Sequence, residues 1–172
     1  MNQSMKLRPI EPEDIHFLYE LENDKDLWTL SDQQQGFSKK VLLEYIQQAD
    51  RDIYEAKQLR LGIEEISSGE LLGFVDLFDF DPKNRRAGVG IIIKDKEKRN
   101  NGIGTMVLKE IISYAFDVLF LNQLYANISI DNKASIALFM KAGFMETGTK
   151  KDWVFDGNSF KDVYFFQLLN TK

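Results

Sequence analysis

Apolar residues recur every three to four positions in four stretches of the chain, which is the spacing of one helix face. The first stretch begins at Pro12, a residue tolerated in the first turn of a helix, and the second follows Ser38, which can cap a helix. The third runs from Ile103 to Val118, and the fourth from Asn132 through Phe139. The pattern therefore predicts four helices, which carry Ile15, Leu18, Tyr19 and Glu22; Val41, Leu42, Tyr45 and Ile46; Val107, Ile111, Tyr114, Ala115 and Val118; and Leu138 and Phe139.

Seven shorter segments are apolar runs or alternate apolar with polar residues, and turn-forming residues separate several of them. These predicted strands cover residues 6–10, 59–66, 71–80, 87–93, 124–130, 145–155 and 160–168. Strands and helices in this order predict an α/β fold with a mixed central sheet flanked by helices. A chain of 172 residues with 44% hydrophobic content is expected to bury its core as one domain, residues 1–172.

A loop with two glycines, between predicted strand 87–93 and the third predicted helix, is the segment most indicative of function. It reads Arg99-Asn100-Asn101-Gly102-Ile103-Gly104. Glycines let the backbone approach a ligand closely, and free N–H groups at a helix start favour an anion such as a pyrophosphate. A tight connection without a ligand is the alternative interpretation. A P-loop is excluded because the chain has no Gly-Lys pair, and a dinucleotide fingerprint fits poorly because Val107 stands where its third glycine would fall.

Composition narrows the class of protein further. The chain has no cysteine and one histidine, His16, which excludes disulfides, thiolate metal sites, a cysteine acyl intermediate and a multi-histidine metal centre. No apolar stretch approaches the ~20 residues of a membrane span, and residues 1–4 lack the features of a signal peptide. The net charge of −5 argues against general nucleic-acid binding. We therefore expect a cytoplasmic protein without a metal, a membrane or nucleic acid as partner.

Charge is distributed unevenly along the chain. Residues 11–32 hold one base, Lys25, against eight acids: Glu11, Glu13, Asp14, Glu20, Glu22, Asp24, Asp26 and Asp32. Residues 94–99 instead hold four bases, Lys94, Lys96, Lys98 and Arg99. Two interpretations follow. Either the basic segment faces a phosphate-rich cofactor and the acidic one attracts a cationic substrate, or both are solvated surfaces that keep the protein soluble.

Three motifs in fixed order carry a resemblance to a known family. They are Arg99-x-x-Gly102-x-Gly104, then Asn132-x-x-Ser135, then Lys141-x-Gly143-Phe144. Together they resemble the acetyl-CoA site of the GNAT superfamily of N-acetyltransferases, in particular the branch with spermidine N-acetyltransferases and ribosomal-protein N-terminal acetyltransferases. The likeness runs from Lys6 to the last predicted strand near Leu168. It implies the GNAT acyltransferase fold, a largely antiparallel central sheet flanked by helices.

The resemblance implies direct transfer of acetyl from acetyl-CoA to an amine. The backbone of the strand before the loop would hold the pantetheine arm like an added strand, and the loop amides would hold the pyrophosphate. Carried over residue by residue, the cofactor-binding set is Ile91, Ile92, Ile93, Arg99, Asn100, Asn101, Gly102, Ile103, Gly104, Thr105, Asn132, Ser135, Phe139 and Lys141.

The sequence departs from its relatives at both proton-transfer positions. Many relatives have a tyrosine where this chain has Phe139, so Ser135 becomes the candidate donor of a proton to the thiolate; a helix-start residue bonded only to nearby backbone is the alternative. Relatives often have a glutamate where this chain has Gly88. Asp76 is the candidate base, because its expected neighbours on one strand face are phenylalanines that would raise its pKa. Glu146, Asp152 and Asp162 are further candidates that the sequence does not rank.

Three functions stay open at this point. The acidic segment favours an acetyltransferase acting on a polyamine or another small cationic amine. Asn132-x-x-Ser135 and the missing glutamate favour acetylation of a protein or peptide N-terminus. Gly88 and Phe139 together favour an acyl-CoA-binding sensor without catalysis. A homodimer is considered because 13 phenylalanines leave material for a dimer surface.

Overall fold

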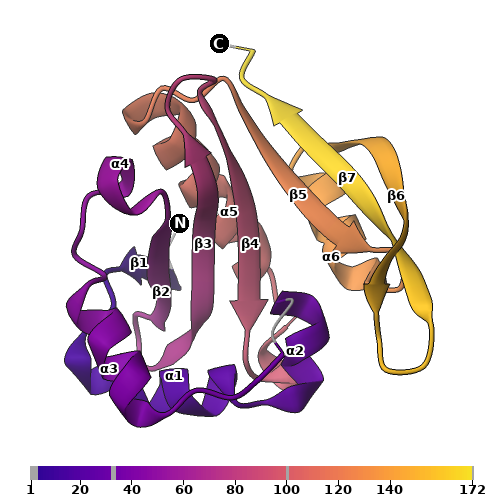
Figure 1. Cartoon of the computed structure of the whole chain (residues 1–172). Helices are drawn as coiled ribbons and strands as arrows, with labels where there is room; N and C mark the ends of the chain where they lie inside the picture. Colours follow the sequence, from indigo (N-terminus) through magenta and orange to yellow (C-terminus); the bar gives the residue numbers. More distant parts are fainter. Residues whose placement is uncertain (1–3, 32–33, 100, 172) are drawn as a thin grey trace.

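The computed structural model describes residues 4–31, 34–99 and 101–171, with the side chains of residues 29–31 left out. A single seven-stranded sheet runs through it in the order β1-β2-β3-β4-β5-β7-β6 (Figure 1). The strands are β1 Met5–Arg8, β2 Leu59–Glu65, β3 Leu71–Asp81, β4 Arg86–Ile93, β5 Gln123–Ser129, β6 Met145–Phe155 and β7 Phe160–Leu169. All neighbours are antiparallel except β4 and β5. The expected mixed, largely antiparallel sheet is confirmed.

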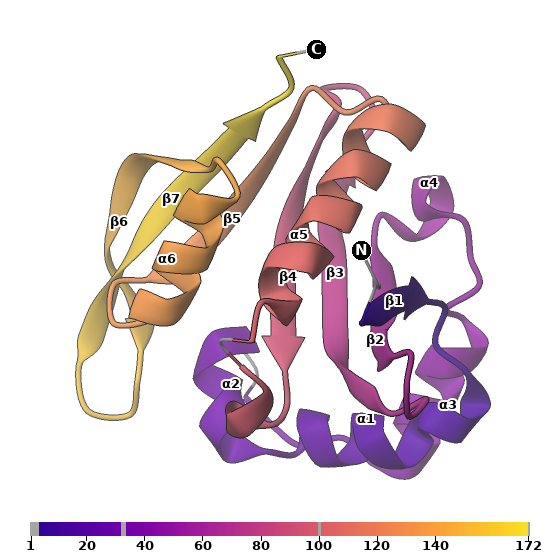
Figure 2. The same ribbon diagram turned by 180° about the vertical axis from the view of Figure 1, so that it is seen from behind.

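Helices cover the two faces of the sheet unequally. Helix α5 (Ile103–Ser113), continued by a π-helical turn over Tyr114–Val118, and helix α6 (Lys133–Lys141) lie on one face (Figure 2). Their apolar sides and the sheet enclose the main core, which includes Val107, Leu108, Ile111, Phe139 and Phe144. Of the described residues, no helix crosses the other face near the β3–β4 turn (Figure 1).

A second, smaller core closes the end of the sheet at which β4 finishes. A 3₁₀ turn over Pro12–Asp14 leads into α1 (Ile15–Glu22), followed by α2 (Lys25–Ser31) and α3 (Lys39–Gln47). Leu18, Leu21, Leu27, Leu42 and Ile46 of these helices pack with Leu71 and Phe74 of β3. Ser38 caps α3 as expected, because its hydroxyl accepts a bond from the amide of Val41 at 3.3 Å.

Most predicted elements lie where the pattern placed them, and the differences have local causes. Strand β1 ends at Arg8 rather than Ile10, because Pro9 has no N–H for the ladder. Helix α2, helix α4 (Ile53–Ala56) and a 3₁₀ turn over Lys96–Lys98 were not predicted. These elements span seven, four and three residues, which is too short for a helical period to be read reliably.

Candidate active site

Strands β4 and β5 form only a short joint in the middle of the sheet. They pair at Arg86↔Gln123, Ala87↔Leu124 and Gly88↔Tyr125, and then separate, so that the gap between them widens towards the end of β4 (Figure 1). The amide of Lys94 donates to the carbonyl of Leu72 in β3 at 3.0 Å. Because backbone groups alternate sides along a strand, those of Ile91 face the gap. Part of β4 thus offers an edge to which an extended ligand can be added.

The start of helix α5 lies beyond the end of β4 and presents free amide groups. Gly102 is the residue before the helix and has φ +83°, a left-handed conformation that favours glycine. The amide of Met106 closes the first helical bond, to the carbonyl of Gly102 at 3.1 Å. The amides of Ile103, Gly104 and Thr105 therefore have no partner within the helix, and they carry the positive end of its dipole. These are amides at which the sequence predicts an anion to bind.

Arg99 and Asn101 fix the loop that leads into this helix. The Arg99 guanidinium donates to the carbonyls of Ile93 at 2.9 Å and Lys94 at 3.1 Å, and its own amide donates to Lys96 at 3.2 Å. Arg99 thereby ties the loop to the end of β4 through its Nε and Nη2 groups. Asn101 donates a weaker bond to the carbonyl of Glu97 at 3.4 Å. The predicted contact of Asn100 lies outside the described residues.

The basic segment beside this loop borders a surface hollow of about 510 Å³, lined by Lys94, Asp95, Lys96, Glu97 and Lys98. Two of its bases are ion-paired: Lys94 with Glu20 of α1, and Lys98 with Glu70 at 2.6 Å. The acidic and basic segments of the sequence therefore meet in space at Glu20 and Lys94. The segment offers less free positive charge than its sequence suggests.

Helix α6 flanks the gap from the side of β5. Asn132 caps it, because its side-chain oxygen accepts a bond from the amide of Ser135 at 3.1 Å. Ser135 itself is half-buried in the first turn, whereas Lys141 is exposed in the last. Phe139 is buried and packs edge-to-face on Phe144, with ring centroids 5.0 Å apart. Its ring therefore belongs to the core under the site.

The ring of Phe78 fills the space next to Gly88, the position at which relatives often have glutamate. A Cβ atom built on Gly88 would overlap the ring of Phe78, which lies against the backbone of β4. The space for a longer side chain at position 88 is filled from β3. A carboxylate for this site has to come from another strand.

Asp76 has a cationic neighbour rather than the purely apolar environment expected from the sequence. Its carboxylate accepts bonds from Arg60 at 2.6 and 3.3 Å, and Arg60 also donates to Glu22 of α1 at 2.6 Å. Burial would lower the pKa of Arg60, but the charges of Asp76 and Glu22 outweigh it and raise that pKa. The guanidinium also lies over the rings of Tyr45 and Phe74. Asp76 therefore takes part in a fixed charge cluster.

The other candidate bases lie on the β6–β7 hairpin. Asp162 pairs with Lys151 at 2.7 Å, and the bond from Lys151, with a bond from the amide of Asp152, lowers the pKa of Asp162. A lowered pKa makes a weaker base. Glu146 is exposed and accepts a bond from the Thr149 hydroxyl at 3.3 Å, and Asp152 is exposed with φ +47°. Among the described residues, the side-chain hydrogen bonds and ion pairs of these three acids involve other residues of the β6–β7 hairpin and none of the β4–β5 joint.

Two residues that the sequence analysis did not single out meet at the joint. The hydroxyl of Tyr125 donates to the carboxylate of Asp79 at 3.2 Å. The two residues are 46 positions apart, so no local pattern connects them. Only the pairing of β3, β4 and β5 brings them together.

The acidic segment is partly neutralised by ion pairs. Asp14 pairs with Arg8 at 2.7 Å, Glu22 with Arg60, and Glu20 with Lys94. Asp24 and Asp26 are exposed, and Asp32 lies outside the described residues. The segment therefore offers a cationic substrate fewer free charges than its eight acids imply.

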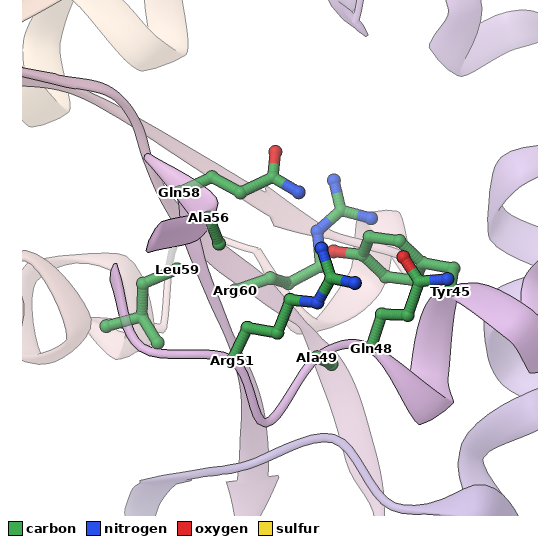
Figure 3. A pocket seen from close by; sticks show the side chains of 8 residues that line it. All are labelled: Tyr45, Gln48, Ala49, Arg51, Ala56, Gln58, Leu59 and Arg60. Atoms are coloured by element: carbon green, nitrogen blue, oxygen red, sulfur yellow. The ribbon is translucent and has the colours of Figure 1, made fainter. Parts of the chain in front are cut away.

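A pocket of about 130 Å³ lies away from the loop, where α3, α4 and the start of β2 meet (Figure 3). Its lining residues are Tyr45, Gln48, Ala49, Arg51, Ala56, Gln58, Leu59 and Arg60. It contains none of the residues expected to bind acetyl-CoA. Within the described ranges, no helix is long and apolar enough to cross a membrane, and no group of three or more His, Cys, Asp or Glu side chains is placed to hold a metal ion.

Comparison with known proteins agrees with this geometry. The sequence profile of the acetyltransferase (GNAT) domain matches residues 4–145. The chain belongs to the GNAT acetyltransferase family. This membership makes it an N-acetyltransferase, and it confirms the resemblance drawn from the three motifs.

Individual GNAT relatives cover most of the chain. A spermidine N(1)-acetyltransferase of Escherichia coli K12 is 30% identical over 147 residues, which cover 84% of this chain and 75% of the relative. A putative ribosomal N-acetyltransferase of Bacillus subtilis is 27% identical and covers 98% of this chain and 93% of the relative. The crystal structure of spermidine N-acetyltransferase from Vibrio cholerae in complex with CoA and spermine shares the fold, with a TM-score of 0.88, 24% identity, and coverage of 99% and 98%.

Proposed function

We propose that this GNAT enzyme transfers the acetyl group of acetyl-CoA to a primary amine of a polyamine or another small cationic amine. The observation that carries the proposal is the gap between β4 and β5, with the first-turn amides of α5, which have no partner within the helix, at its wide end. The spermidine N-acetyltransferase relatives support the acceptor class. We extend the proposal to the whole chain as one domain in the cytoplasm; a homodimer stays a prediction.

The residues of the gap have separate tasks in this proposal. Acetyl-CoA supplies the activated acetyl group. Backbone groups of β4 near Ile91 bind the pantetheine arm as an added strand, and the amides of Ile103, Gly104 and Thr105 bind the pyrophosphate. The ammonium form of the amine first loses a proton to solvent, and the neutral amine attacks the thioester carbon. The C–S bond breaks, the sulfur leaves as a thiolate, and the nitrogen loses a second proton to solvent as the amide forms. Ser135 gives that thiolate a proton, which the hydroxyl regains from solvent.

A panel of acceptors tests the function. Purified protein is incubated with acetyl-CoA and spermidine, an aminoglycoside, free amino acids, or short peptides with a free N-terminus, and thiol release is measured. We expect turnover with spermidine, rising towards pH 9 as the alkylamine, with a pKa near ~10, loses its proton. Turnover with peptides alone would instead support N-terminal acetylation, which the Bacillus subtilis relative favours. Tight acetyl-CoA binding without any acceptor-dependent thiol release would support a sensor.

Replacing Ser135 by alanine tests the proton donor. We expect kcat to fall about 10²- to 10⁴-fold with little change in the KM for acetyl-CoA, because the hydroxyl acts on the leaving thiolate. Ser135→Thr keeps a hydroxyl and should retain most activity. Asn132→Ala is the matched control, since it removes the helix cap and leaves the Ser135 hydroxyl in place. Equal losses in Asn132→Ala and Ser135→Ala would reduce Ser135 to a structural role.

A further inference from the structure

Tyr125 stands at the apex of the gap between β4 and β5. Tyr125 and Gly88 form the last residue pair of β4 and β5 before the two strands separate. Leu124 and Ala126 belong to the core under α5 and α6, so strand alternation places the Tyr125 side chain on the opposite face of the sheet. There its ring lies 5.9 Å from the ring of Phe78, edge-to-face, and 5.4 Å from that of Phe165. The apex therefore has an aromatic lining.

The reacting end of acetyl-CoA would reach this lining. In the proposed function the pyrophosphate lies at the start of α5, beyond the end of β4, and the pantetheine arm follows β4 back towards Gly88. The thioester at the far end of the arm then arrives beside Phe78 and Tyr125. An acceptor amine has to approach from the open face on which these rings lie.

A bulge in β3 turns Asp79 towards the same place. The register between β3 and β4 shifts between Phe78 and Asp81, and Asp79 has φ +48°. Bulges re-aim side chains, and aspartate is one of the residue types that tolerate this left-handed conformation. The exposed carboxylate accepts the bond from the Tyr125 hydroxyl. Burial, together with the charge of Asp79, raises the pKa of Tyr125 to about 12, so the hydroxyl keeps its proton and its bond.

Asp79 also carries free negative charge in a region where other charges are paired. Among the acids of β3, Asp76 pairs with Arg60 and Asp81 with Arg86, whereas no basic side chain of the described residues lies within ion-pair distance of Asp79. The charged groups around the rings are Arg86 and Lys150. Lys150 bonds to Asn127 at 2.7 Å and lies over the ring of Phe165 at 5.4 Å, so a cation already binds an aromatic face next to Tyr125.

We propose that Phe78, Tyr125 and Asp79 form the subsite that binds the acceptor amine in its ammonium form, before it loses the proton and attacks as a neutral amine. The carboxylate accepts its N–H groups, and the ring faces attract its positive charge and the adjoining methylene groups. Asp79 thereby supplies, from β3, the negative charge that Gly88 lacks on β4. The assignment rests on the proposed function and adds where its substrate binds.

Asp79→Asn tests the subsite, because asparagine tolerates a left-handed conformation and removes only the charge. Spermidine is titrated calorimetrically into protein saturated with CoA, and the KM values for spermidine and acetyl-CoA are measured in parallel. We expect spermidine affinity to fall at least about 10-fold, with acetyl-CoA affinity within about 2-fold of the wild type. Tyr125→Phe should give a smaller loss. Asp50→Asn, an equal charge change at an exposed residue beyond α3, should leave both affinities unchanged.

The outcomes separate this subsite from the proposed function. Unchanged spermidine affinity in folded Asp79→Asn, with an active wild type, would overturn the subsite alone. Spermidine binding that needs Asp79 but gives no turnover would support the subsite and overturn the proposed function. A wild type that binds neither spermidine nor any other cationic amine of the acceptor panel would overturn both.

Discussion

At the scale of single residues, Gly88 and Phe78 depend on each other. The Phe78 ring occupies the position of a Cβ atom at residue 88, so Gly88→Ala forces the ring or the backbone of β4 to move. We expect a loss of about 1–3 kcal/mol of unfolding free energy, measured by denaturant unfolding. In a Phe78→Ala background, the same alanine should cost clearly less, because the ring is gone. Gly88→Ala with wild-type stability would show that Phe78 rotates away freely.

Residue-scale chemistry was also the hardest part to predict from the sequence. Local motifs in the sequence identify the loop glycines, Asn132 and Ser135, because helix caps and anion-binding loops depend on residues that are close together in the chain. The partner of Asp76 could not be predicted: Arg60 reaches it through the pairing of β2 with β3, which depends on strand register. The contact of Tyr125 with Asp79 needs a bulge as well.

At the scale of elements, the two glycines at the start of α5 have different roles. Gly102 provides the left-handed turn, with open space around its Cβ position, whereas a Cβ atom on Gly104 would lie 3.0 Å from Leu138 of α6. Gly104 therefore allows α5 and α6 to pack closely. It also leaves the amides of the first turn accessible to an anion.

Gly104→Val should separate these two contributions when it is combined with Leu138→Ala. The single variant is expected to lose stability against α6 and to raise the KM for acetyl-CoA steeply, because the branched side chain covers the proposed pyrophosphate site. Leu138→Ala in the same chain should recover part of the stability, read by thermal unfolding, while the KM stays high. Recovery of both quantities in the double variant would assign Gly104 to helix packing only.

Strong periodicity decided which elements the sequence could predict. The helices around Leu42, Ile111 and Leu138 present repeated apolar faces to the sheet, and the strands were found to within a few residues at each end. Helix α2 follows α1 after a short break and contributes Leu27 to the smaller core. One buried apolar residue in a helix does not produce a periodic pattern that the sequence could reveal.

At the scale of the whole molecule, charge links distant segments. Glu20 and Lys94 join α1 to the loop after β4, and Glu22 and Arg60 join α1 to β2. The acids left exposed on this side include Asp24 and Asp26. Their field should attract a polycation and weaken with salt, because the Debye length falls from ~10 Å at 0.1 M to ~3 Å at 1 M.

Neutralising Asp24, Asp26 and Asp32 together to asparagine tests this field. We expect the KM for spermidine to rise and its dependence on salt to become shallower, with no effect on the KM for acetyl-CoA. The matched control changes three acids of α3, α4 and the segment between them, Glu44→Gln, Asp50→Asn and Glu55→Gln. An equal response in both triple variants would assign the effect to net charge rather than to the acidic segment.

The joint of three residue pairs between β4 and β5 has a thermodynamic consequence. A ligand that fills the gap as a strand binds only the folded chain, so on the proposed function acetyl-CoA stabilises the fold by mass action, by ~2.7 kcal/mol when its free concentration is ~100 times its Kd. The fraction of unfolded protein then depends on the concentration of its own substrate, because the sheet has few residue pairs in its middle. Its survival against proteolysis would follow the supply of activated acetyl groups.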